Sequence, residues 1–149
     1  MAPSPSPPPR ALDVLMAMRE AAIARSVEDM RRVYAIDAVH EFPFTRPGVP
    51  SRMEGREAII GFVSAFWRTT PLRYERYRTI AVHSTADPDT IVVEQEVEGT
   101  SSTTGPFVLP NVLVLTVRGG EIAHVRDYAN LVALEAATGN AARRAPGSR

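Results

Sequence analysis

The first half of the chain carries apolar residues at helical spacing, which predicts three amphipathic helices. Ser26 stands three residues before Asp29, a pattern typical of a helix N-cap, and it marks the start of the second helix. The third helix is expected over residues 56–70, where Pro71 ends it because proline cannot continue a helix. The apolar positions of the three helices are Leu12, Leu15, Met16, Ala22 and Ile23; Val27, Met30, Val33 and Tyr34; and Ile59, Val63, Phe66 and Trp67.

Between and after these helices, side chains alternate with a period of two, which is typical of β-strands. A short strand is expected over residues 37–44, with one face formed by Ala38, His40, Phe42 and Phe44. Long strands are expected at residues 72–84, 90–102, 107–117 and 121–130. Helices followed by a meandering antiparallel sheet indicate an α+β fold, with one curved sheet wrapped over the helices.

The last two strands are joined by Gly119-Gly120, and a two-residue Gly-Gly link is a strong signal for a tight hairpin. If Val117 pairs directly with Ile122, every later pair of the hairpin is fixed as well. Asp127 then becomes the one ionisable group on a face of small apolar side chains, which are Val112, Val114 and Val125.

The opposite face of the same hairpin is also largely apolar. It carries Leu113, Leu115 and Ile122, together with His124 and Arg126. The helices can cover only one face of the sheet, so we expect this second face to be buried in a homodimer.

Composition narrows the classes of function. The 149 residues are 44% hydrophobic and suit one globular domain, and 17 basic residues balance 17 acidic ones, which gives no field to attract nucleic acid or a membrane. The chain has no cysteine, no lysine and only three scattered histidines, so we expect no metal site and no Schiff-base chemistry. No glycine-rich phosphate motif is present, so no cofactor is expected, and the expected partner is a small apolar organic ligand.

The sequence predicts a single domain at residues 11–137 with a disordered tail at each end. Residues 1–10 are rich in proline and lack the apolar core of a signal peptide, and residues 138–149 show no periodicity. No stretch approaches the length of apolar sequence that a membrane helix needs, so we expect a cytoplasmic protein.

The order of these elements resembles a known family. The AVHEFPF strand after two short helices, the EGREAI helix start and the closing GGEIAHVRDYAN are similar to the SnoaL-like and PhzA/PhzB-like branch of the nuclear transport factor 2 superfamily. The resemblance spans about residues 11–137. It implies a cone-shaped fold in which a strongly bent, mostly antiparallel sheet and three helices enclose a pocket, commonly as a homodimer. Members include cyclases, isomerases and proteins without catalytic activity, so the fold leaves function open.

Individual positions narrow the chemistry that the resemblance allows. The positions that similar ketosteroid isomerases use for catalysis correspond to Phe42, Met18 and Val112, all apolar, which argues against steroid-type isomerisation. The PhzA/PhzB-like proteins use an acid in an Arg-Glu-aromatic motif of the last strand, and Arg126-Asp127-Tyr128 matches that motif in kind. The histidine that assists their acid corresponds to about Phe62, so this chain lacks it.

His40 is the candidate to supply the missing histidine. It shares a strand face with Phe42, and the ordinary pKa of histidine suits proton transfer near neutrality. The alternative is a core histidine that bonds to a backbone carbonyl or to Tyr34. For Asp127 the alternative is a structural hydrogen bond to the loop after Phe44, although an unpaired carboxylate among valines is costly.

These residues define the expected site and function. Asp127 and His40 are the candidate catalytic residues, and the expected substrate contacts are Tyr34, Phe42, Phe62, Phe66, Trp67, Val112, Val114 and Val125. The expected function is cofactor-independent acid–base chemistry, of the cyclase, isomerase or dehydratase type, on an apolar polycyclic or polyketide-like metabolite. The alternative is a ligand-binding or accessory dimeric protein of the same fold that has no catalytic activity.

Overall fold

The computed structural model describes residues 10–139. The predicted tails at residues 1–10 and 138–149 lie outside this range, except for residue 10 at one end and residues 138 and 139 at the other. In chain order the elements are α1 (Ala11–Ala24), α2 (Val27–Val33), β1 (Tyr34–Glu41), β2 (Arg52–Glu54), α3 (Arg56–Thr69), β3 (Leu72–Ser84), β4 (Thr90–Ser101), β5 (Gly105–Arg118), β6 (Glu121–Tyr128) and α4 (Leu131–Thr138).

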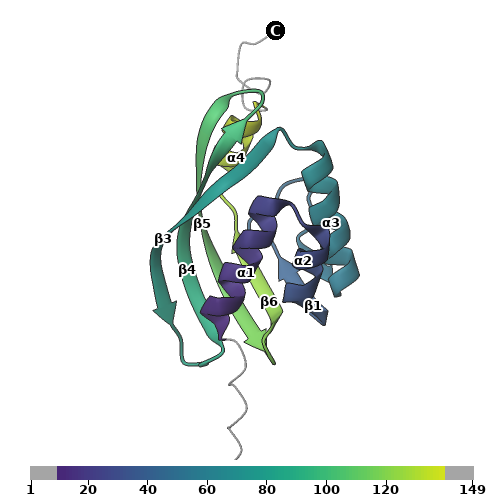
Figure 1. Cartoon of the computed structure of the whole chain (residues 1–149), viewed down its shortest axis with the longest axis vertical. Helices are drawn as coiled ribbons and strands as arrows, with labels where there is room; N and C mark the ends of the chain where they lie inside the picture. The colour runs from purple at the N-terminus through teal and green to yellow at the C-terminus, as the bar shows by residue number, and fades with distance from the viewer. Residues whose placement is uncertain (1–9, 140–149) are drawn as a thin grey trace, which may run out of the picture.

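The strands form a single six-stranded sheet in the order β2-β1-β6-β5-β4-β3. Every neighbouring pair is antiparallel except β1 and β6, which are parallel. Figure 1 shows α1, α2 and α3 grouped on one side of the strongly twisted sheet, with α4 at the end of the molecule where β4 turns into β5. The predicted α+β fold with a curved, mostly antiparallel sheet is therefore confirmed.

The local signals in the sequence account for most of the element boundaries. The Ser26 side chain accepts a hydrogen bond from the Asp29 backbone N–H and caps α2 as predicted. The third helix and the two long strands β3 and β4 also lie where the sequence placed them, to within one residue. The first strand begins three residues earlier than predicted, at Tyr34, and ends at Glu41.

The helix α4 was not predicted. It begins after Asn130, whose side chain accepts a hydrogen bond from the Ala133 backbone N–H, and it ends at Gly139 in the left-handed conformation. The hydroxyl groups of Thr103 and Thr104, in the turn between β4 and β5, donate to the last carbonyls of α4 and hold it against the sheet.

The register of the β5–β6 hairpin differs from the prediction. Val117 faces Ile122 as expected, but the next pair is Thr116 with His124, so β6 carries one extra residue, Ala123, at a β-bulge. Because side chains alternate across a strand, this single insertion exchanges the faces of every later residue. Asp127 therefore lies opposite Leu113 and shares the inner face with it.

The inner face of the sheet forms the main core with the helices. Leu15 of α1, Ile59 of α3 and Leu115, Ile122 and Val125 of the hairpin are all fully buried there. Each such side chain contributes about 1.5–3 kcal/mol through removal of its apolar surface from water. The face of Leu113, Leu115 and Ile122 is thus covered within the subunit, and the prediction that it forms the dimer interface was wrong.

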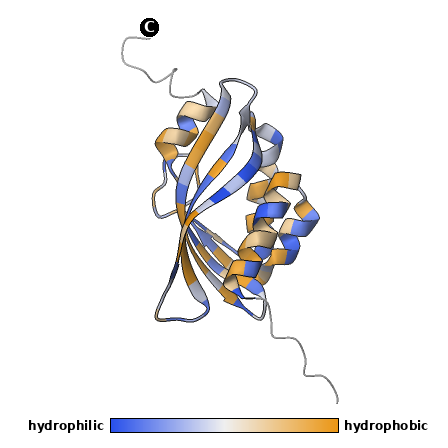
Figure 2. Cartoon of the chain, turned by 60° about the vertical axis from the view of Figure 1, so that its left-hand side comes forward, coloured by the Kyte–Doolittle hydropathy of each residue, from blue (hydrophilic) through white to orange (hydrophobic). Residues whose placement is uncertain are grey.

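The outer face of the sheet has a different character. Figure 2 shows hydrophobic (orange) and hydrophilic (blue) residues alternating along the strands, as expected for a sheet with an apolar and a polar face. At its centre three half-buried valines on β4 and β5 form what we call the outer valine stripe, Val92, Val112 and Val114. Arginine and glutamate side chains of β3 and β4 lie beside this stripe and pair with one another.

No helix in the described part of the chain is long and apolar enough to cross a membrane.

Candidate active site

A cavity of about 290 Å³ lies between the inner face of the sheet and the helices. Most of the substrate contacts expected from the sequence line it, namely Tyr34, Phe42, Phe62, Phe66, Trp67 and Val125. Val112 and Val114 do not, because the bulge at Ala123 of β6 places Val125 and Asp127 on the same face as Leu115 and Leu113 and leaves the two valines on the outer face. The hairpin register predicted from the sequence was wrong, and Val112 and Val114 were therefore wrongly predicted to contact the substrate.

The two ionisable candidates meet inside this cavity. The Nε2 atom of His40 on β1 lies 3.7 Å from the Oδ2 atom of Asp127 on β6, and both side chains are largely buried. The strands are adjacent and parallel, with His40 opposite Val125, so Asp127 lies one inward-facing position further along β6. The distance is too long for a hydrogen bond and short enough for a strong electrostatic interaction.

Each member of the pair has a second partner on its far side. The Nδ1 atom of His40 lies 3.1 Å from the Tyr34 hydroxyl, and the Asn111 amide donates a 3.1 Å hydrogen bond to Oδ1 of Asp127. The His40 ring also packs against Phe42, with 5.0 Å between ring centres. These contacts fix the orientation of both side chains, so Nε2 of His40 and Oδ2 of Asp127 face each other.

Three tyrosines line the cavity together with Asp127, with Tyr34 buried and Tyr74 and Tyr77 partly buried. Burial raises the pKa of Tyr34 and of Tyr74 well above the ordinary value, and the charge of Asp127 raises both further. Burial is also the main cause of the raised pKa of Tyr77. All three phenols therefore stay neutral at physiological pH and can donate hydrogen bonds to groups in or beside the cavity.

The family model of the SnoaL-like domain matches residues 15–125, which is most of the chain. This chain belongs to the SnoaL-like family. The match agrees with the resemblance drawn from the order of the sequence elements, and the cavity described above lies between elements that the match includes, together with the end of β6 just beyond it.

Two relatives of this SnoaL-like protein are themselves uncharacterized. The protein YesE of Bacillus subtilis is 26% identical over 131 residues, which cover 87% of this chain and 88% of YesE. A PhzA/B-like protein of Pseudomonas aeruginosa is 33% identical over 95 residues, which cover 63% of this chain and 65% of that protein.

Solved structures similar to this SnoaL-like protein include one enzyme and one ligand complex. A Bacillus subtilis protein proposed to be an isomerase superposes with a TM-score of 0.79 at 25% identity, covering 87% of this chain and 92% of that one. A Mycobacterium tuberculosis protein in complex with estradiol-17β-hemisuccinate gives a TM-score of 0.67 at 20% identity, with 83% and 95% covered. A Δ5-3-ketosteroid isomerase from Mycobacterium sp. gives 0.66 at 21% identity, again with 83% and 95% covered. The last two likenesses show the fold alone.

Of the three positions that correspond to ketosteroid isomerase catalysis, Phe42 and Met18 line the cavity of this SnoaL-like protein and Val112 does not. The bulge brings Leu113 to the inner face in place of Val112, so the corresponding side chain is apolar in either register.

Three polar residues in or beside the cavity were not predicted from the sequence to belong to the site: Arg19, Gln95 and Asn111. Arg19 on α1 is 5% exposed and donates to Gln95 and Thr79, while Gln95 on β4 lines the cavity. Two signals were present. Gln95 alternates with three glutamates and so belongs to the inner face, and Arg19 stands in the apolar stripe of its helix, four residues after Leu15.

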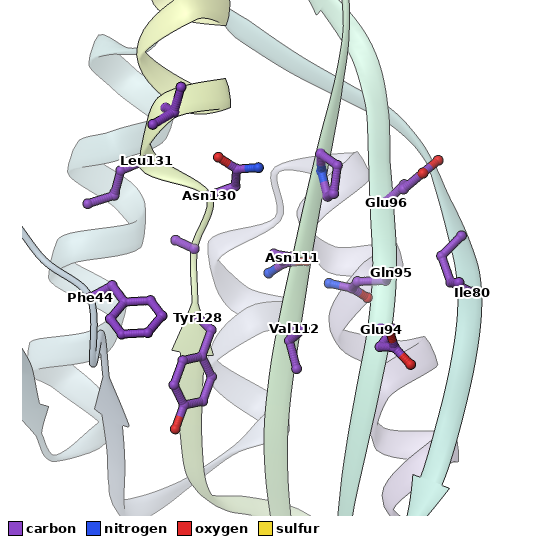
Figure 3. A pocket seen from close by; sticks show the side chains of 13 residues that line it. Phe44, Ile80, Glu94, Gln95, Glu96, Asn111, Val112, Tyr128, Asn130 and Leu131 are labelled. Carbon is purple, nitrogen blue, oxygen red and sulfur yellow. The ribbon is translucent and has the colours of Figure 1, made fainter.

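A second hollow of about 580 Å³ lies on the outer side of the sheet and is more open (Figure 3). Phe44, Tyr128 and Val112 border it, together with Glu94 and Glu96. It is larger than the inner cavity but contains neither His40 nor Asp127, so we place the candidate active site inside. Among residues 10–139 no group of three or more His, Cys, Asp or Glu side chains could hold a metal ion.

Proposed function

We propose that this protein catalyses proton transfer on an apolar polycyclic or polyketide-like metabolite without a cofactor, with Asp127 as the principal acid or base and His40 as its partner. The observation that carries the proposal is the 3.7 Å separation of the carboxylate and imidazole within a largely apolar and aromatic cavity. A carboxylate in such surroundings is destabilised unless it is paired, which favours exchange of a proton.

The neighbours of His40 support the assignment of its proton to one of the two ring nitrogens. Tyr34 stays neutral because burial raises its pKa, so its hydroxyl can donate to Nδ1 of the imidazole. The neutral imidazole then carries its proton on Nε2, which faces Oδ2 of Asp127. In this arrangement the carboxylate accepts a proton from a C–H bond next to a substrate carbonyl, and the electron pair moves to the carbonyl oxygen. The imidazole N–H holds the carboxyl group in position, and the proton then returns from Asp127 to carbon.

The size and lining of the cavity support the class of substrate. A cavity of about 290 Å³ with Phe42, Phe62 and Trp67 in its walls suits a fused-ring molecule. The steroid ligand of the similar Mycobacterium tuberculosis protein supports the same class, although the likeness to that protein shows only the fold.

The alternative is a protein of the same fold that holds a metabolite without changing it. The apolar side chains of Phe42 and Met18, at cavity positions that the family resemblance assigns to catalysis in ketosteroid isomerases, favour this alternative. Hydrogen exchange on a bound ketone distinguishes the two functions.

The test measures deuterium incorporation next to the carbonyl of 2-tetralone, a bicyclic ketone, in D₂O by NMR. We expect the wild-type protein to accelerate exchange and Asp127→Asn to lose about 10² to 10⁴ of that acceleration while keeping its affinity for the ketone. His40→Gln should lose less, and the double variant should lose less than the product of the two single losses, because the residues act as a unit.

The matched control is Glu96→Gln, the same carboxyl-to-amide change on the outer face of the sheet, which should leave the exchange rate unchanged. A wild-type protein that binds 2-tetralone without accelerating exchange would establish the binding alternative. An Asp127→Asn protein with the wild-type rate would exclude the acid–base role.

We further propose that the protein is a homodimer formed through the outer valine stripe rather than through the face first expected. The stripe is apolar and half-buried, and the side chains beside it carry both signs of charge, including the Arg78–Glu96 pair. A surface with both signs can complement itself across a two-fold axis. A cytoplasmic location stays a prediction.

A further inference from the structure

The wall of the cavity formed by β4 and β5 carries two neighbouring amide side chains, Gln95 on β4 and Asn111 on β5. The two residues are directly opposed in the antiparallel register, and both line the cavity. Directly opposed side chains on one face of a sheet have Cβ atoms about 4.5–5.5 Å apart, so these amides lie side by side.

Arg19 determines which way the Gln95 amide points. Its Nε and Nη2 atoms both donate to Oε1 of Gln95, at 3.1 and 2.8 Å, and its Nη1 atom donates to the Thr79 hydroxyl at 2.8 Å. A guanidinium has only donors, so the oxygen of Gln95 must face it and the nitrogen must point away. Figure 3 shows the Gln95 nitrogen directed toward β5, the strand that carries Asn111. Within residues 10–139 this nitrogen donates no hydrogen bond to another residue.

Asp127 determines the orientation of Asn111 by the opposite logic. A carboxylate only accepts hydrogen bonds, so the nitrogen of Asn111 faces Oδ1 of Asp127. The oxygen of Asn111 is left buried, and it has no hydrogen-bond partner within the described residues. One donor and one acceptor, each oriented by a charged neighbour, therefore stand next to each other in the cavity wall.

We propose that Gln95 and Asn111 form a hydroxyl-binding subsite, in which Gln95 Nε2 donates to a ring hydroxyl or enol of the ligand and Asn111 Oδ1 accepts its proton. A hydroxyl is the smallest group that presents an acceptor and a donor on one atom, whereas a carbonyl would leave the Asn111 oxygen unpaired. The subsite rests on the proposed function for the ring-bearing class of ligand and adds where the polar group of that ligand binds.

Arg19 is a positioning residue in this scheme. The residue is 5% exposed, burial lowers its pKa from the ordinary value, and its hydrogen-bond partners among the described residues are neutral. It also lies over the Tyr77 ring, with Cζ 5.4 Å from the ring centre. A buried charge is costly, and an apolar side chain could fill the same volume. Holding the Gln95 amide in one orientation is the role that this structure gives it.

The test compares two ligands of the same shape, 1-naphthol and 1-naphthylamine, with naphthalene as the reference, by calorimetric titration of the full chain. The hydroxyl offers an acceptor and a donor, whereas the aromatic amine offers two donors and is a poor acceptor. We expect the wild-type protein to bind 1-naphthol about 10-fold more tightly than 1-naphthylamine, the effect of one unpaired hydrogen-bonding group.

Gln95→Glu keeps an oxygen for Arg19 but replaces the cavity-facing donor with an acceptor. This variant should reverse the order, so that 1-naphthylamine binds more tightly, and leave naphthalene binding unchanged. The control Glu96→Gln, on the outer face of the sheet, should keep the wild-type order. Arg19→Met should reduce the ratio of the two affinities toward one without weakening naphthalene, which a purely structural role would not do. If Arg19→Met fails to fold, Gln95→Glu still carries the test.

Two results would overturn the subsite: equal affinities in the wild type, or a wild-type order that survives Gln95→Glu. These are equilibrium measurements on ligands that do not react. A failure of 2-tetralone exchange would thus remove the proposed catalysis and leave the subsite standing, and equal naphthol and naphthylamine affinities would do the reverse.

Discussion

The two faces of the sheet hold carboxylates in opposite circumstances. On the outer face Glu96 pairs with Arg78 at 3.0 Å and Glu94 pairs with His83 at 2.7 Å. On the inner face Asp127 has an amide as its hydrogen-bond partner and an imidazole at 3.7 Å. On the outer face each of these carboxylates thus pairs with a basic side chain. On the inner face Asp127 has no basic side chain within hydrogen-bonding distance among the described residues.

The partner, rather than burial, distinguishes Glu96 from Asp127, because 22% of the Glu96 side chain and 21% of the Asp127 side chain are exposed. An exposed ion pair contributes about 0–1 kcal/mol, because water already solvates both charges. Asp127 instead has the neutral amide of Asn111 as its hydrogen-bond partner, so its charge is offset less than that of Glu96. The outer carboxylates keep the surface polar, whereas the proposed role of Asp127 is to exchange a proton.

The largest contrast in stability is expected between Leu115 and Val108, two apolar residues of β5. Leu115 is fully buried on the inner face, and Val108 is about half exposed on the outer face. Leu115→Ala should lower the free energy of unfolding by about 2–5 kcal/mol, because it removes buried surface and leaves a cavity. Val108→Ala should lower it by about 0.5 kcal/mol or less. Urea denaturation at equal protein concentration measures both, and similar losses would contradict the assignment of the two faces.

An intermediate effect is expected at the centre of the outer face. Val114→Glu places a charge within the outer valine stripe and should convert the proposed dimer to a monomer, because an unpaired charge in the interface is costly. Sedimentation at micromolar concentration is the measurement. The matched control is Ile36→Glu, the same kind of change at a residue that is 75% exposed on β1, and it should leave the dimer intact. A wild-type protein that sediments as a monomer would exclude the dimer.

The smallest effect on stability is expected from Glu41 on β1, which pairs with His124 and Arg52. Its hydrogen bond to His124 lowers the pKa of its carboxyl below the ordinary value, with a further contribution from Arg52. A lowered pKa stabilises the fold above the ordinary pKa of glutamate, and that stability is lost as the pH falls through the lowered value.

Wild-type protein should therefore exceed Glu41→Gln in stability near pH 6 by less than about 1 kcal/mol, and the difference should shrink as the pH falls below the ordinary glutamate pKa. Chemical denaturation across this pH range measures it. A difference that grows toward acid pH would show that the pair does not have this role.

The helical half of the fold could be predicted well because its signals are local. Ser26 caps α2 and Pro71 follows α3, and each acts within one turn of its own helix. The sequence also contained the signals for α4, with Asn130 before it and Gly139 after it. The predicted strand was extended through Asn130, so this residue was not recognised as the N-cap of α4 and the helix was not predicted.

The candidate site could be predicted only in part. The pairing of His40 with Asp127 followed from the faces of two strands, and the structure places the two side chains together, while their catalytic role stays a prediction. The predicted neighbours Val112 and Val114 were wrong because the register was taken as regular. No local signal distinguishes a bulge at Ala123 from direct pairing, because both arrangements satisfy the same Gly-Gly turn.

The sequence by itself determined the elements, the α+β class and the family, since spacing, caps and turns act between residues close along the chain. Only the tertiary structure decided which face of β5 is buried, because that choice depends on whether leucines or valines of the hairpin pack better against helices from the other half of the chain. The same packing brought Arg19 of α1 to Gln95 of β4, a contact across 76 positions of sequence. Long-range burial, rather than local pattern, therefore determined which polar groups meet in the cavity.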